Sequence, residues 1–177
     1  MGVNTTIVVT KPLGNRKPDM LDILKALSLP VVVDEQDLDF DYVLGHEDLV
    51  AAVFEDKVIF IDRCENMDTA RIPAFTTAYP AEVLRVVNSD TTDSGGFLFW
   101  RDGKLVREVT FGADWMLDDL KAAGITDPKI LDLHRSKNTG DPLDFEKASH
   151  FAMDVLANYA LDFYAFDQLP WTSFRAP

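Results

Sequence analysis

The apolar residues of this chain fall into short runs that are separated by turn-forming residues. Short runs rich in Val, Ile and Phe, or with strict apolar–polar alternation, predict β-strands rather than helices. Strands are predicted over residues 5–10, 31–33, 37–42, 49–54, 57–62 and 82–88, with two more within residues 94–112. Because neighbouring strands are joined by short turns, we expect largely antiparallel pairing.

The dipeptide Asp102-Gly103 predicts a tight hairpin turn between the last two strands. Both central residues of a type I′ turn need positive φ, which Asp and Gly tolerate. The turn predicts the pairs Arg101–Lys104, Trp100–Leu105, Phe99–Val106 and Leu98–Arg107. Both faces of this hairpin are apolar, so we expect both to be covered, with Arg107 stacked on Trp100. Glu55-Asp56 predicts the turn of a second hairpin.

Helices are predicted in three places. Asp19 is a candidate cap for a short helix whose apolar side holds Leu21, Leu24, Ala26 and Leu27. Residues 114–123 predict another short helix. In residues 143–163 apolar positions recur at steps of three and four, which predicts a long helix. Residues 67–79 are expected to be irregular, because prolines interrupt them.

The elements together predict an α+β fold. We expect one domain over residues 1–177, with a largely antiparallel sheet of five to seven strands built from hairpins. The long C-terminal helix is expected to pack on one face of that sheet.

Charge narrows the classes of function. The net charge is −13, from 30 Asp and Glu against 17 Lys and Arg. Such a balance argues against nucleic-acid binding and favours either simple solubility or a basic protein as partner. No apolar run is long enough to span a membrane. The single cysteine, Cys64, allows no intramolecular disulfide, so we expect a cytoplasmic protein.

An acidic stretch and the C-terminal tail are the candidate partner-binding regions. Asp37, Asp39 and Asp41 alternate with apolar residues, as the exposed side of a half-buried strand does. With Asp48 they also match the spacing of a calcium loop, but the residue at the required glycine is Tyr42. Trp171 and Phe174 are expected to be exposed and to bind a partner, since aromatic side chains anchor interfaces. The alternative for the tail is that it packs on the body of the protein.

Three further groups of residues are candidates for binding or chemistry. Lys11, Arg16 and Lys17 precede a predicted helix and are a candidate anion site, with a basic surface loop as the alternative. Glu146, His150 and Asp154 recur at steps of four and are a candidate metal site, with an exposed helix face as the alternative. Cys64 is a candidate nucleophile, because a thiolate needs a nearby base or cation and Arg63 is adjacent, with His46 and His134 as candidate bases; an inert cysteine is the alternative. No catalytic triad is visible, and no cofactor is predicted.

The segment FLFWRDGKLVREV, followed by G-x-P-L-x-F-E at residues 140–146, resembles a group of small uncharacterised bacterial proteins. The resemblance covers residues 94–174, under half of the chain. It implies a bacterial cytosolic α+β protein. Its motifs are a turn, a cap and the start of a helix, and they carry no catalytic residues.

These observations lead to three hypotheses about function. The first is a non-enzymatic protein-binding domain, immunity- or antitoxin-like or regulatory, that covers a basic partner with its acidic surface; one continuous acidic patch supports it. The second is a small enzyme or ligand-binding module with an unrecognised pocket. The third is a homodimer formed through the hairpin face or the C-terminal tail.

Overall fold

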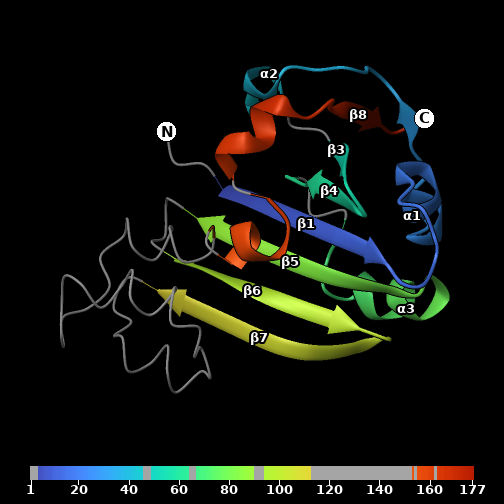
Figure 1. Cartoon of the computed structure of the whole chain (residues 1–177), viewed down its shortest axis with the longest axis vertical. Coiled ribbons are helices and arrows are strands. Elements are labelled where there is room, and N and C mark those ends of the chain that lie inside the picture. Colours follow the sequence, from blue (N-terminus) through green and yellow to red (C-terminus); the bar gives the residue numbers. More distant parts are fainter. Residues whose placement is uncertain are drawn as a thin grey trace.

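The computed structural model describes residues 4–45, 49–63, 67–89, 94–112, 153, 155–161 and 163–177. These residues form one eight-stranded antiparallel sheet in the spatial order β2-β8-β3-β4-β1-β5-β6-β7 (Figure 1). The strands are β1 (Asn4–Pro12), β2 (Val32–Val33), β3 (Leu49–Phe54), β4 (Lys57–Ile61), β5 (Ala81–Ser89), β6 (Ser94–Arg101), β7 (Lys104–Gly112) and β8 (Thr172–Arg175). The predicted α+β fold with a largely antiparallel sheet is confirmed, but the described sheet has eight strands rather than five to seven.

The centre of the sheet is β1, which pairs with β4 on one side and β5 on the other. Ile7, Val8 and Val9 are fully buried there, as β-branched residues often are on a pleated surface covered on both sides. Ile7 and Val9 belong to one apolar cluster and Val8 to another. The sheet therefore separates two cores, here named the first core and the second core.

Helices cover both faces of the sheet. The first core is covered by α2 (Phe40–Gly45), by the helical residues 155–159 and by the 3-10 helix η1 (Phe163–Gln168). The second core is covered by α1 (Met20–Ala26) and α3 (Arg71–Ala78). Figure 1 shows the helical residues 155–159 (orange) in front of the sheet and η1 beside α2 at the top, with α1 and α3 at the right-hand end of the sheet.

The helix α1 begins where the sequence predicts. Asp19 caps it by accepting a hydrogen bond at Oδ1 from the backbone N–H of Asp22 at 3.0 Å, which satisfies one of the free donors of the first turn. Leu24 and Leu27 are buried as expected. Leu21, predicted on the apolar side, is instead 53% exposed, because the buried side of this short helix is centred on Ile23 and Leu24.

The prediction that residues 67–79 are irregular is wrong, because α3 lies within them. Pro73 is the third residue of this helix, where a backbone N–H has no intrahelical partner, so its missing donor costs nothing. Asp68 Oδ1 accepts hydrogen bonds from the N–H groups of Ala70 and Arg71, both at 2.9 Å. These bonds satisfy two free N–H groups at the start of α3, a helix that the prolines of this stretch argued against in the sequence.

Both predicted hairpins are confirmed, but the register of β6 with β7 changes part of the way along. Asp102 and Gly103 have φ values of 51° and 73°, as a type I′ turn requires. The first two pairs are as predicted: Arg101–Lys104 and Trp100–Leu105. A bulge then leaves Val106 unpaired, so that the next pairs are Phe99–Arg107 and Leu98–Glu108.

The bulge corrects two predictions about the faces of this hairpin. The guanidinium of Arg107 lies over the ring of Phe97, 5.8 Å from its centroid, and not over Trp100. The strand β6 is covered on both faces as expected, since Phe97 belongs to the first core and Trp100 to the second. On β7, by contrast, Leu105 and Val106 are 45% and 60% exposed.

The C-terminal tail is part of the sheet. The strand β8 lies between β2 and β3, although more than a hundred residues separate it from either strand along the chain. Of the long helix predicted over residues 143–163, residues 155–159 are helical and residues 160–161 are not. The rest of that helix, apart from Met153 and Phe163, and all of the one predicted over 114–123, lie outside the described residues.

Candidate partner-binding surface

An exposed run of carboxylates, here named the acidic segment (residues 34–41), follows β2 along the upper edge of the molecule to α2 (Figure 1). All of its carboxylate side chains are exposed: Asp34, Glu35, Asp37, Asp39 and Asp41. The predicted exposure of the last three is therefore confirmed. Asp34 and Glu35 belong to the same exposed surface.

The backbone of the acidic segment is held against the C-terminal tail. The N–H of Asp34 donates to the carbonyl of Ser173 at 2.9 Å, and the N–H of Ser173 donates to the carbonyl of Glu35 at 2.9 Å. The N–H of Leu38 donates to the carbonyl of Trp171 at 3.0 Å. These bonds fix the segment from Asp34 to Leu38, and Asp41 lies in α2, which begins at Phe40, so the carboxylates are presented from a defined backbone.

Aromatic packing beneath the segment explains why the strand predicted over residues 37–42 does not form. Only Leu38 makes an isolated bridge, to Trp171, and α2 begins at Phe40. Phe40 and Val43, three residues apart, are both buried in the first core, which is the spacing of a helix. The ring of Phe40 stacks on Trp171, with centroids 5.8 Å apart.

Most of the carboxylates of the segment face solvent without a counter-charge. The Asp34 Oδ1 pairs with the Nε of Arg175 at 2.7 Å. Within the described part of the chain, Glu35, Asp37, Asp39 and Asp41 form no ion pair. Residues 34–48 contain seven Asp and Glu and no Lys or Arg, so this stretch supplies about half of the net charge of −13.

The prediction that Trp171 and Phe174 are exposed is wrong. Their side chains are 0% and 2% exposed, Trp171 in the first core and Phe174 in the second. The Nε1 of Trp171 donates to the carbonyl of Phe166 at 2.8 Å, which satisfies its buried donor. The tail is buried because β8 pairs with strands from the N-terminal half, and Trp171 packs against Phe40 of the acidic segment.

The three predicted anion-binding residues do not share one site. Arg16 and Lys17 line an open pocket of about 700 Å³, together with Asp19 and Asp22, whose charges oppose an anion. The guanidinium of Arg16 lies 4.9 Å from the centroid of the Tyr79 ring. Lys11 does not line this pocket. Its Nζ pairs with Asp56 Oδ2 at 2.9 Å instead.

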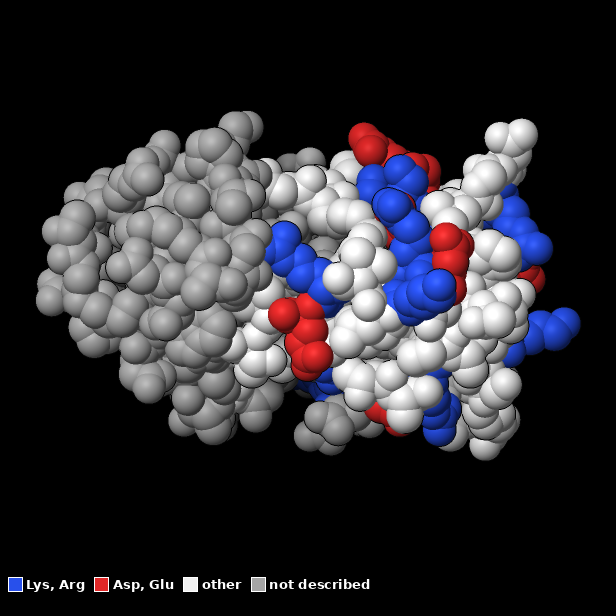
Figure 2. Space-filling model, turned by 90° about the horizontal axis from the view of Figure 1, so that it is seen from below, with Lys and Arg blue, Asp and Glu red and all other residues white. Residues whose placement is uncertain are grey.

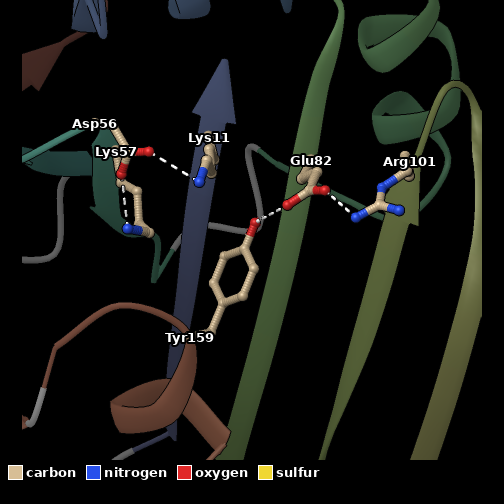
Figure 3. Close-up of polar contacts among 6 residues, drawn as sticks. All are labelled: Lys11, Asp56, Lys57, Glu82, Arg101 and Tyr159. Atoms are coloured by element: carbon tan, nitrogen blue, oxygen red, sulfur yellow. Dashed lines mark hydrogen bonds and ion pairs between the residues drawn. The ribbon is translucent and has the colours of Figure 1, made fainter. Parts of the chain in front are cut away.

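That ion pair belongs to a row of charges across β1, β5 and β6 (Figure 3). Lys11 is paired in register with Glu82, and Glu82 with Arg101. The guanidinium of Arg101 binds Glu82 Oε1, and the hydroxyl of Tyr159 donates to Glu82 Oε2 at 3.1 Å. The row could not be found from sequence, because it depends on the order of the strands.

The charges of this row neutralise one another. Hydrogen bonds from Lys57 and Lys11 lower the pKa of Asp56 to about 2, and the same contact with Asp56 raises the pKa of Lys11. Burial, and then the charge of Glu82, raise the pKa of the Tyr159 hydroxyl. The row thus ties the helical residues 155–159 to the sheet, and its charged groups are already paired.

Several predicted site residues lie outside the described residues. These are Glu146, His150 and Asp154 of the metal hypothesis, Asp48 of the calcium loop, and Cys64, His46 and His134 of the nucleophile hypothesis. Among the residues that are described, no three His, Cys, Asp or Glu side chains are grouped as a metal site would require. None of the described helices has the length and apolar character needed to cross a membrane.

The opposite side of the molecule has a different charge pattern. Figure 2 views the protein from below, the side of β7, and shows Lys and Arg side chains beside Asp and Glu. The acidic segment, in contrast, carries one sign of charge only.

Comparison with known proteins adds no evidence about the function of this surface, since no family model, curated protein or solved structure matches the chain.

Proposed function

We propose that this protein is a non-enzymatic binding protein that docks a basic protein partner on its acidic segment. The net charge of −13 and the clustered carboxylates favour an immunity- or antitoxin-like role, or a regulatory one, and the sequence resemblance implies only that this role is carried out in a bacterial cytoplasm. The observation that carries it is the row of exposed carboxylates at Glu35, Asp37, Asp39 and Asp41, which have no counter-charge among the described residues.

The way these carboxylates are held supports a role in binding. Their backbone is fixed by hydrogen bonds to Ser173 and Trp171, so a partner would not have to order the segment on docking. Ordering a loop costs free energy that reduces affinity, and a prearranged surface avoids that cost. Charges of one sign on a fixed surface also speed the encounter with a partner of the opposite sign.

The alternative, a ligand-binding module, is favoured by one observation. The open pocket beside Arg16, Lys17 and Tyr79 has the volume of a small-molecule site. Its two carboxylates and its openness make it a weaker candidate than the acidic segment. Replacing both basic residues by alanine is expected to leave partner binding unchanged.

A comparison of charge variants tests the proposal. The segment variant combines Glu35→Gln, Asp37→Asn, Asp39→Asn and Asp41→Asn. The matched control changes the net charge equally at exposed sites elsewhere: Asp22→Asn, Glu55→Gln, Glu108→Gln and Asp167→Asn. Each tagged protein is used for capture from its native host at about 50 mM and about 500 mM salt, because screening weakens exposed charge pairs.

We expect the wild type and the matched control to retain one basic protein at low salt and to release it at high salt. The segment variant should not retain it. Recovery of no basic protein at either salt, or equal recovery by the segment variant, would overturn the proposal.

A further inference from the structure

We propose that the partner presents an extended strand of alternating apolar and basic residues, which adds to the free edge of β2. This inference rests on the proposed function, because it names the chemistry of the partner that the acidic segment receives.

The first support is the edge itself. Within the described residues β2 is the outermost strand, paired only with β8. An edge strand offers backbone N–H and C=O groups to an added strand. Val32 and Val33 are 38% and 39% exposed, and successive strand residues point to opposite faces. Both faces of this edge are therefore apolar and open.

The second support is an apolar groove that leads into β2. It has a volume of about 510 Å³ and is lined by Leu29, Pro30 and Val31, with Leu21 and Leu24 of α1 as its wall. Leu21 is 53% exposed, more than either Val32 or Val33. Together with the two valines, the groove forms a continuous apolar surface at one end of the acidic segment. Lys25 also lines the groove and is its only charged residue.

The order of these features along the chain specifies the partner. Apolar groove, apolar edge and carboxylates follow one another from Leu29 to Asp41. A strand that pairs with β2 would meet valines first and carboxylates immediately afterwards. Alternating apolar and basic residues satisfy both, because one set of side chains covers apolar surface and the other pairs with the carboxylates.

A second copy of this chain fits the same surface less well. The chain repels itself through its net charge of −13. The other edge strand of the described residues, β7, carries Glu108 beside Lys104 and Arg107, and it has a bulge that interrupts the regular ladder an added strand needs. A partner protein of opposite charge is therefore the occupant that the structure favours.

Two peptides of equal charge test the inference on the full-length protein. Each has about ten residues, enough to extend past β2 along the acidic segment. One alternates valine with lysine, and the other alternates serine with lysine. Both carry a fluorescent label, and binding is measured by fluorescence anisotropy. We expect the valine peptide to bind about tenfold more tightly, because only it can cover the apolar edge and groove.

Single substitutions locate the binding edge. Val33→Lys introduces a charge at the edge, and Leu21→Asp places one in the groove. Each is expected to remove most of the tenfold preference for the valine peptide. Val53→Lys is the matched control, since Val53 is 37% exposed on a strand that is paired on both sides. Thermal melting checks that all three variants are folded.

The outcomes separate this inference from the proposed function. One outcome is that the two peptides bind equally, that Val33→Lys does not change their binding, and that the segment variant binds neither. In that case the inference is overturned and the proposed function stands. If neither peptide binds, the inference is overturned, and the capture experiment alone decides the proposed function. If the protein dimerises at micromolar concentration and the peptides compete with dimerisation, a second copy is the occupant and the inference is overturned. A preference that Val33→Lys removes and Val53→Lys keeps supports it.

Discussion

Among the described residues, the two edges of the sheet are built in opposite ways. At one edge, β7 is nine residues long, is interrupted by a bulge at Val106, and carries Lys104, Arg107 and Glu108. At the other edge, β2 is two valines without a charge or a bulge. Charges and bulges are the usual means by which a long edge strand avoids pairing with other chains. The long edge is thus protected against strand addition, whereas no described residue pairs with the outer side of the short one, which lies beside a groove.

The same contrast holds for how each edge is anchored. The strand β7 is joined to its neighbour by a local turn, and the tip of that hairpin contacts α3 through a bond from the Gly103 N–H to Thr76 Oγ1 at 3.1 Å. The strand β2 depends on β8, which comes from the far end of the chain. Substitutions that weaken one anchor should therefore loosen one edge and spare the other.

The largest effect is expected from Trp171→Ala. This side chain is fully buried, contacts Phe40 and Phe166, and lies beneath the acidic segment. Its truncation should lower the free energy of unfolding by about 3–5 kcal/mol, measured by urea denaturation. Hydrogen exchange should quicken over residues 32–41 more than over residues 104–112. Equal loss of protection at the two edges would contradict independent anchoring.

A smaller effect, at the opposite edge, is expected from Gly96→Ala. A Cβ at this position would lie 2.2 Å from the carbonyl oxygen of Val109, so β6 and β7 would have to separate. We expect the free energy of unfolding, measured by urea denaturation, to fall by about 1–3 kcal/mol. Hydrogen exchange should become faster over β7 and stay unchanged over β2. Thr110→Ala, at an exposed position of β7, is the control and should change neither. Unchanged stability of Gly96→Ala would show that the two strands have room to adjust.

The smallest effect on the free energy of unfolding is expected from Asp56→Asn, at a turn between the two edges of the sheet. Its pKa is lowered to about 2 in the folded protein, from an unperturbed value of 3.8. A lowered pKa means that the carboxylate stabilises the fold above pH 3.8 and that this contribution disappears as the pH falls through 2. Because Asp56 is 53% exposed, Asp56→Asn should cost less than about 1 kcal/mol at pH 7.

Urea midpoints of the wild type and of Asp56→Asn should differ slightly at pH 7 and coincide near pH 2. Hydrogen exchange at both edges should be unchanged. Glu55→Gln, at the neighbouring turn position, is the control and should show no difference at any pH. A difference that persists at low pH would mean that Asp56 acts through the turn rather than through its ion pairs.

Local signals predicted the local parts of the fold. The turn at Asp102-Gly103 and the cap at Asp19 were found from sequence, since both depend on neighbouring residues only. The register beyond Trp100 was not found, because the bulge depends on how β7 fits against β6. Alternation over residues 37–42 predicted a strand, yet packing of Phe40 against Trp171 favours a helix there.

The candidate surface was predicted only in part, because some of its features depend on neighbouring residues and others depend on distant parts of the chain. The exposure of Asp37, Asp39 and Asp41 followed from their alternation with apolar residues. The contribution of Val32 and Val33 could not be found, because a short apolar run normally predicts a buried strand. Trp171 and Phe174 were assigned to the surface since no local pattern shows that the tail enters the sheet.

The position of β8 also has a consequence for biosynthesis. The partner strand of β2, and the groups that hold Asp34 and Glu35, are translated about 140 residues after them. Domains fold as their sequence emerges from the ribosome, so the central strands can pair while the acidic segment still has nothing to bind against. An unfinished or prematurely terminated chain would contain every carboxylate of the surface without the surface itself. Recognition of a partner would thereby be reserved for chains whose synthesis has passed Arg175.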